Sequence, residues 1–204
     1  VNNLYSVSET GGTPVQLNDP LVSGGRDFDF KISDDGNTVL YNADQITDGT
    51  NDLIAVPIGG GSNIQLTSSL TATNQGVSEY SMVGDSAIFT WDEDAVARRE
   101  IYKVNIAGGT ARMLHTKTVA NSYVWGFRIS PDETQVVFSG DFITIGVREI
   151  FRMPITGGLP TRINNDFAPS RDAKTFRGFK FSPDGTQVMY YSEIGLNTLE
   201  EVSI

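Results

Sequence analysis

The densest group of oxygen-bearing side chains lies in the polar segment 42–52 (NADQITDGTND). The four candidate ligands in it are Asp44, Asp48, Asn51 and Asp52. Carboxylate and amide oxygens are the ligands that Ca²⁺ prefers, and a glycine among them lets the chain bend around an ion. Their spacing is not that of an EF-hand loop. The segment therefore predicts either a Ca²⁺ site or a solvated loop of turn-forming residues, and the loop is the simpler interpretation.

A second candidate site is basic. Three basic side chains fall at one position of the repeat described below, on its innermost strand: Lys31, Arg128 and Lys180. If these strands surround a channel, the three cations would face its axis and bind an anionic ligand, and Trp125 would frame the mouth. The alternative is ion pairing with acidic side chains on the same and neighbouring strands, which is the more economical interpretation because buried charges are normally paired.

The residues needed for enzymatic chemistry are scarce. His115 is the single histidine, there is no cysteine, and no Gly-x-Ser-x-Gly motif is present. A Ser-His-Asp triad or a histidine-rich metal centre would need more than this inventory offers. His115 ends a predicted outer strand, where we expect a surface position. We therefore expect the chain to have no catalytic activity of its own.

Charge and hydropathy narrow the range of partners. The 204 residues include 15 Lys and Arg against 25 Asp and Glu, for a formal net charge of −10. This balance argues against nucleic acid or an anionic membrane as the main partner. No apolar run approaches the roughly 18 residues of a membrane span, so we expect no membrane insertion. The sequence begins with Val1 and shows no signal peptide, and we expect it to be a processed or excised piece.

The chain is built on a repeat. A strand, a Gly-Gly pair and a second short strand recur four times, and the second glycines are Gly12, Gly61, Gly109 and Gly158. Their intervals are 49, 48 and 49 residues. A constant period in this range predicts a propeller, a solenoid or an array. Gly-Gly between alternating runs supplies the positive φ angles that a tight hairpin needs.

Each full period contains four predicted strands. Alternating apolar residues place the aromatic and aliphatic columns of successive repeats on shared faces. Phe30, Tyr80, Phe127 and Phe179 form one such column. No useful helical periodicity is present. The pattern predicts an all-β chain, a single β-propeller domain over 1–204 with about four four-stranded blades. The repeats are approximately 20–67, 68–116, 117–164, and 165–204 together with 1–19.

The repeat resembles the WD40-like, or TolB-type (PD40), β-propeller repeat. The resemblance is carried by FKFSPDG at 179–185 and FRISPD at 127–132, while SDDG at 33–36 departs by one residue and 83–85 departs most. It covers essentially the whole chain. It implies a propeller fold, whose known members include binding scaffolds, periplasmic proteins and gating domains of serine peptidases.

Ring closure is open at the level of sequence. Residues 14–17 could supply the outermost strand of the last blade and close a four-bladed ring. However, residues 3–8 and 200–204 both match the third strand of that blade, so one of them is surplus. This redundancy predicts either a part of a larger ring or a homo-oligomer formed through open strand edges.

The functional expectation is a non-enzymatic scaffold that binds a protein or a small ligand, without a cofactor unless Ca²⁺ binds. The first alternative is the propeller of a larger, prolyl-oligopeptidase-like hydrolase whose catalytic domain lies elsewhere. The second is a self-assembling structural module. The resemblance implies an extracytoplasmic location, either periplasmic or secreted.

Overall fold

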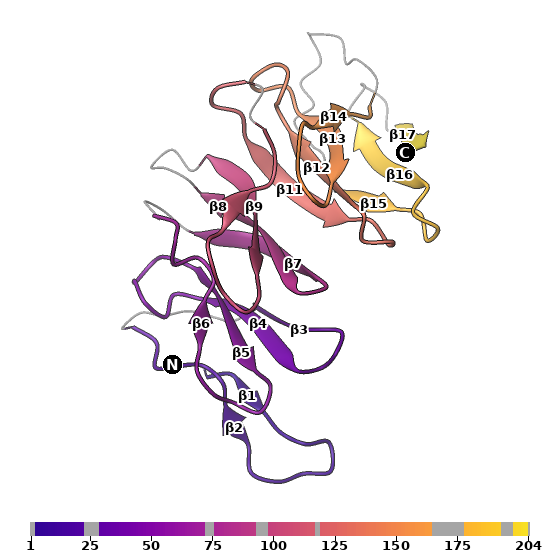
Figure 1. Cartoon of the computed structure of the whole chain (residues 1–204). Coiled ribbons are helices and arrows are strands. Elements are labelled where there is room, and N and C mark those ends of the chain that lie inside the picture. Colours follow the sequence, from indigo (N-terminus) through magenta and orange to yellow (C-terminus); the bar gives the residue numbers. More distant parts are fainter. Residues whose placement is uncertain are drawn as a thin grey trace. The chain divides into compact units, whose positions relative to one another are not determined.

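The computed structural model describes residues 3–22, 29–71, 76–92, 98–116, 119–164, 178–192 and 198–203. Every regular element in this part of the chain is a β-strand (Figure 1). Among these residues there is no helix long and apolar enough to cross a bilayer. The all-β prediction is therefore confirmed.

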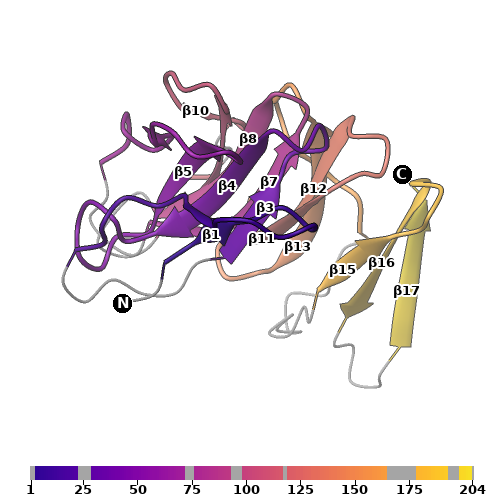
Figure 2. The same ribbon diagram turned by 90° about the horizontal axis from the view of Figure 1, so that it is seen from below.

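The strands pair in chain order within five sheets. The first sheet holds β1 (Tyr5–Ser6) and β2 (Val15–Gln16). The second holds β3 (Asp29–Ile32), β4 (Thr38–Ala43), β5 (Asp52–Pro57) and β6 (Ile64–Gln65). The third holds β7 (Val77–Val83), β8 (Ser86–Asp92), β9 (Arg99–Asn105) and β10 (Arg112–Met113). The fourth holds β11 (Val124–Ile129), β12 (Gln135–Gly140), β13 (Glu149–Pro154) and β14 (Thr161–Arg162). The fifth holds β15 (Phe179–Phe181), β16 (Gln187–Ser192) and β17 (Thr198–Ser203), drawn side by side in Figure 2.

These sheets are the predicted propeller blades. Three of them have four strands, the last has three described strands, and β1–β2 is a two-stranded sheet whose strands match the third and outer strands of the repeat. The prediction of a β-propeller with four-stranded blades is confirmed. In the described chain β2 pairs with β1, through Tyr5 and Gln16, and the last sheet is β15–β16–β17.

The chain divides into two compact units. The N-terminal unit comprises Val1–Ala97 and Tyr102–Arg112, and the C-terminal unit comprises Arg98–Ile101 and Met113–Ile204. The boundary passes through β9 and through β10. The prediction of a single domain and of ring closure stays a prediction.

The N-terminal unit has its core where the β1–β2 hairpin covers the β3–β6 sheet. Leu17 packs in one cluster with side chains of β4 and β5: Val39, Tyr41, Ala43, Ile54 and Val56. The backbone N–H of Leu17 donates to the carbonyl of Leu4 at 2.8 Å, and Ser6 Oγ donates to the carbonyl of Ile58 at 2.6 Å. The first bond closes the β1–β2 hairpin, and the second ties the hairpin to the residue that follows β5.

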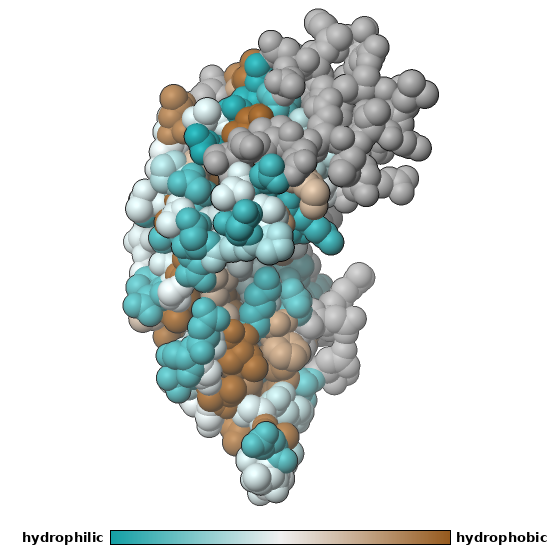
Figure 3. Space-filling model, turned by 90° about the vertical axis from the view of Figure 1, so that its right-hand side faces the viewer, coloured by the Kyte–Doolittle hydropathy of each residue, from teal (hydrophilic) through white to brown (hydrophobic). Residues whose placement is uncertain are grey.

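The hairpin leaves the innermost strand of that sheet uncovered. The column predicted at Phe30 is buried at its other three positions, Tyr80, Phe127 and Phe179. Phe30 itself is 52% exposed because the cluster around Leu17 contains residues of β4 and β5 but none of β3. Exposed hydrophobic surface over the N-terminal unit is visible in Figure 3.

The core of the C-terminal unit repeats the same arrangement. Val137 of β12 and Ile150 of β13 pack against Phe179, Val188 and Tyr190 of the last sheet. Each fully buried side chain of this size stabilises the fold by about 1.5–3 kcal/mol relative to an exposed one. Phe179, the aromatic side chain on the innermost strand β15, is thus a main packing contact between the last two sheets.

The Gly-Gly pair has a specific structural role. The first glycine adopts φ of +85° to +99° in all four copies, as an L residue rarely does. In three copies this glycine also lies against the outer strand region of the preceding sheet. A Cβ added to Gly60 would lie 2.7 Å from Val15 Cγ1, and one added to Gly108 would lie 3.2 Å from Ile64 Cγ2. A Cβ added to Gly157 would lie 2.4 Å from the carbonyl oxygen of Leu114. The Gly-Gly turn is therefore a contact between blades as well as a hairpin turn.

The Gly-Gly contact predicts different costs for one substitution at two repeat positions. Gly11 shares the positive φ but has nothing within 4 Å of an added Cβ. Gly11→Ala should cost about 1–2 kcal/mol from backbone conformation alone. Gly157→Ala should cost about 3 kcal/mol or more, because backbone must also move. Urea unfolding of both variants measures the difference, and equal losses would contradict the role of the contact.

The turns between the first two strands of the blades share a hydrogen-bonded aspartate. Ser33 Oγ donates to Asp35 Oδ1 at 2.6 Å, and the backbone N–H of Asn37 donates to the same oxygen at 3.0 Å. Asp132 and Asp184 accept the same bonds in the later repeats. Hydrogen bonding, first from Ser33 and then from Asn37, lowers the pKa of Asp35 to about 2.

This pKa shift predicts an acid-sensitive turn. Because the folded-state pKa is lowered from 3.8, ionised Asp35 stabilises the fold above about pH 4, and this stabilisation is lost as the pH falls toward about 2. NMR titration of the Asp35 carboxyl should give a midpoint near 2. In Asp35→Asn, urea unfolding should depend less on pH across that window. A midpoint at or above 3.5 would refute the hydrogen-bonded turn.

Candidate functional site

Two arginines and two aromatic rings meet in the C-terminal unit, at one end of the strands. The Arg148 guanidinium carbon lies 4.2 Å from the centroid of the Trp125 ring, and that of Arg99 lies 5.5 Å from the centroid of the Tyr123 ring. The two aromatic rings are 5.0 Å apart and tilted by 55°. We call these four residues the Arg–aromatic cluster.

The loop between β12 and β13 positions the cluster. Asp141 accepts a hydrogen bond from the backbone N–H of Tyr123 at 2.5 Å and another from Gly146 at 2.9 Å. Phe142 anchors the loop, because its ring is buried against Phe138 and Phe151. The carboxylate of Asp141 thus ties the start of β11 to the loop that carries Arg148.

The same loop presents apolar surface. Ile143 is 51% exposed and Ile145 is 50% exposed, on the segment that leads into Arg148. Fixed aliphatic side chains in solvent are a cost to the isolated protein, and they favour a contact with another molecule.

The electrostatics of the cluster suit an anionic group. Partial burial lowers the pKa of Arg148, while the charges of Tyr123 and Asp141 act in the opposite direction. A guanidinium remains charged in proteins, and stacking on an indole leaves its N–H edge free to form paired hydrogen bonds with a carboxylate. The cluster can therefore hold a carboxylate beside a flat or aliphatic group.

The sequence pattern indicates Trp125 as a site residue, but it does not single out Tyr123, Arg99 or Arg148 as its neighbours. A signal was present, because Arg99 and Arg148 each precede the buried acid at the start of the third strand of their repeats. That alignment puts both arginines at the same end of their sheets. Stacking on the two aromatic rings required the tertiary structure.

The residues of the proposed Ca²⁺ loop differ in their surroundings. Asp44 and Asp52 are buried, while Asp48 is exposed and Asn51 is half-buried. Asp52 accepts a hydrogen bond from Thr67 Oγ1 at 2.5 Å. In the part of the chain that the structure describes, no group of three or more His, Asp or Glu side chains is placed to hold a metal ion. Ca²⁺ binding through the loop oxygens stays a prediction.

The basic column makes contacts with aromatic residues. Lys31 Nζ donates to the carbonyl of Tyr80 at 2.7 Å and lies 5.2 Å from the centroid of its ring. Arg128 donates to the carbonyl of Phe127 at 2.6 Å and lies 6.0 Å from the ring centroid of Phe179. Lys180 is exposed. Lys31 and Arg128 thus each cover the aromatic column residue of the following sheet, and anion binding by the column stays a prediction.

The expectation that His115 lies at the surface is wrong. Its side chain is buried, and Nε2 lies 2.9 Å from Glu100 Oε2. The ring packs edge-on against Phe142, with centroids 4.9 Å apart, and stacks on Phe138 at 6.1 Å. The reason is the position of His115 in the repeat: it is the second residue after the outer strand β10, and it still lies against the start of the third strand β9.

Other repeats show this contact with different side chains. Asn18 Oδ1 accepts a hydrogen bond from the backbone N–H of Leu4, and Asn164 Oδ1 accepts one from Ile150, both at 2.7 Å. His115 Nε2 lies 3.4 Å from the N–H of Ile101, but it cannot accept this proton while donating to Glu100. The shorter contact to the carboxylate is the stronger one. His115 therefore binds the carboxylate where the asparagines cap the backbone.

Burial of the His115–Glu100 pair predicts a large effect of breaking it. His115→Ala leaves the Glu100 carboxylate buried without its imidazole and should lower the free energy of unfolding by about 3–5 kcal/mol. Arg162→Ala is the comparison: Glu149 is also buried, but Arg162 bonds it at 2.7 Å from a partly exposed position where water can take its place, so the cost should be about 1 kcal/mol. Urea unfolding followed by circular dichroism measures both. A cost below about 1 kcal/mol for His115→Ala would contradict the pairing.

No protein-family model and no curated protein matches the sequence. Solved structures do match the fold. A TolB protein from Agrobacterium tumefaciens matches with a TM-score of 0.58 and 23% identity, over 93% of this chain and 62% of that one. TolB from Acinetobacter baumannii matches with a TM-score of 0.57 and 19% identity, over 96% of this chain and 44% of that one. A prolyl endopeptidase matches with a TM-score of 0.63 and 17% identity, over 94% of this chain and 28% of that one.

These matches identify the architecture. The chain is a β-propeller module, and its fold is the TolB-like propeller that TolB proteins and prolyl endopeptidases share. It spans less than two thirds of the length of each of these three proteins.

Proposed function

We propose that the chain is a binding module and that a protein partner docks on the Arg–aromatic cluster together with Ile143 and Ile145. The observation that carries this proposal is the stacking of Arg148 on Trp125 at 4.2 Å, together with two exposed isoleucines on the same anchored loop that leads into Arg148. Tryptophan, tyrosine and arginine are the residues most enriched among binding hot spots.

The chemistry of the cluster favours a partner segment with a carboxylate next to an apolar side chain. The Arg148 guanidinium presents N–H donors in a protein whose net charge is −10, so the cluster is a local site for acidic groups. The isoleucines and the rings supply apolar contact around it. Because the loop is already held by Asp141 and Phe142, binding costs little ordering entropy.

The proposal includes no catalytic step. The TolB-like fold supports an extracytoplasmic location, because the family that the repeat resembles includes periplasmic proteins. Binding of a protein on a rigid loop surface is the usual way in which such scaffolds act.

Capture with matched variants tests the proposed surface. Immobilised wild-type protein is incubated with extract of cells that express it, the retained protein is identified, and the purified pair is titrated. Arg148→Ala and Trp125→Ala should each weaken binding by about 10-fold or more, the usual size of a hot-spot effect. The double variant Ile143→Ser, Ile145→Ser should also weaken it.

Ile46→Ser is the control, because Ile46 is similarly exposed in the equivalent loop of the N-terminal unit. This variant should bind like the wild type. Unchanged affinity in Arg148→Ala and Trp125→Ala, with a folded protein by circular dichroism, would refute the proposed surface.

A second candidate is that the chain is the propeller of a peptidase. The observation that favours it is the match to a prolyl endopeptidase over 94% of this chain. Sequencing the parent gene across both ends of the chain separates the candidates. A Gly-x-Ser-x-Gly domain in the same reading frame would support the peptidase, and its absence would exclude a catalytic domain of this type.

A further inference from the structure

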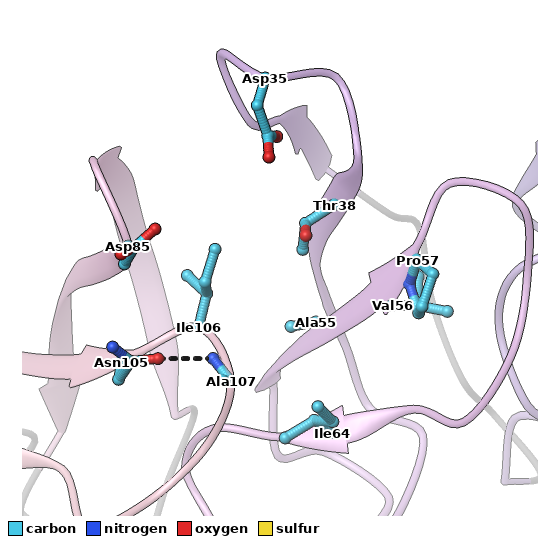
Figure 4. A pocket seen from close by; sticks show the side chains of 10 residues that line it. All are labelled: Asp35, Thr38, Ala55, Val56, Pro57, Ile64, Asp85, Asn105, Ile106 and Ala107. Carbon is cyan, nitrogen blue, oxygen red and sulfur yellow. Dashed lines mark hydrogen bonds between the residues drawn. The ribbon is translucent and has the colours of Figure 1, made fainter.

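The N-terminal unit contains a cavity of about 370 Å³ between the β3–β6 and β7–β10 sheets (Figure 4). Its walls are apolar and its rim is acidic. The apolar lining includes Ala55, Pro57, Ile64 and Ile106, and the acidic residues are Asp35 and Asp85. The volume lies within the range of small-ligand sites.

The cavity lies beside Ala55, a small residue at a repeat position where β9 and β13 carry long basic side chains. Ala55 pairs with Leu40 on one side and Ile64 on the other. The same repeat position holds Lys103 in β9 and Arg152 in β13. Arg152 pairs with Val137, so it lies on the sheet face that packs against the following sheet. An alanine here leaves open the space that a long basic side chain can occupy in another repeat.

At this position β5 carries Ala55, so it provides no basic side chain for the two acidic residues at the rim of the cavity. Asp35 is held in place by Ser33 and by both the backbone and the side chain of Asn37. Asp85 lies at the other side of the cavity, on the β7–β8 turn (Figure 4). None of the described residues that line the cavity is Lys or Arg. The cavity therefore combines an apolar wall with two carboxylates and no cation from its own lining.

We propose that this cavity binds a guanidinium or ammonium group carried on an aliphatic stem. The stem lies against Ala55, Ile64 and Ile106, and the cation lies at the rim beside Asp35 and Asp85. Long basic side chains are suited to this, because their methylene groups pack on apolar surface while their charged end stays at its edge. The same chemistry is found in a small organic cation and in an arginine or lysine side chain of a basic peptide. The site is separate from the Arg–aromatic cluster, which belongs to the other unit.

Butylguanidinium chloride and its neutral analogue butylurea test the chemistry of the site. In methyl-labelled protein, butylguanidinium should shift the NMR signals of Ile64 and Ile106 in a saturable way, and butylurea should bind at least fivefold more weakly. Equal binding of the two compounds, or shifts spread over the whole protein, would overturn the proposal.

Three variants locate the binding. Ala55→Arg places in the cavity the side chain that β13 carries naturally, and it should abolish the shifts. Asp35→Asn and Asp85→Asn should each weaken binding about two- to fivefold, as expected for exposed ion pairs. Asp132→Asn is the control, because Asp132 makes the same turn bonds outside the cavity. Its affinity should equal that of the wild type, and equal weakening by Asp132→Asn and Asp35→Asn would refute a local site.

The peptide acetyl-Gly-Gly-Arg-Gly-Gly-amide and its citrulline counterpart separate the two sources of the cation. Tighter binding of the arginine peptide than of butylguanidinium, lost in Ala55→Arg, assigns the cavity to a side chain of a protein partner. Tighter binding of butylguanidinium assigns it to a small organic cation. Binding of neither compound by folded wild-type protein would overturn the proposal.

Discussion

Each blade of this protein has two apolar faces, and the structure depends on covering both of them. Leu40 and Tyr41 are neighbours in β4 and point to opposite faces of the sheet, yet both are fully buried. A single sheet cannot bury two faces alone, so every blade needs a neighbour on each side. Where the covering hairpin has only two strands, Phe30 stays exposed, although its equivalents in the other blades are core residues.

This packing lets one framework carry different local chemistry. The position after the outer strand holds asparagines that cap the backbone in two repeats, but His115 there binds a buried carboxylate. In the third strand, Ala55 stands where β9 carries Lys103 and β13 carries Arg152, and a cavity lies beside it. The backbone contacts between blades do not need these side chains, so such positions are free to differ among repeats.

Much of this architecture is readable from local patterns in the sequence. Alternation with period two defines the strands, and the Gly-Gly and Ser-Pro-Asp-Gly turns join them, because these features act within a few residues. The site is less readable. The pattern indicates Trp125 as a candidate but not its partner Arg148, since the two are 23 positions apart and β12 lies between them along the chain. His115 was misplaced for a similar reason, because burial depends on rings contributed by the next sheet.

The sequence by itself determined the strands, their order and the repeating blade, since hydrophobic period and turn chemistry are properties of short segments. Only the tertiary structure decided which face of each blade is covered, which basic side chain stacks on which ring, and where a small residue opens a cavity. These outcomes depend on side chains from different sheets meeting in space. Their distances are set by the packing of blades on one another, which no local pattern encodes.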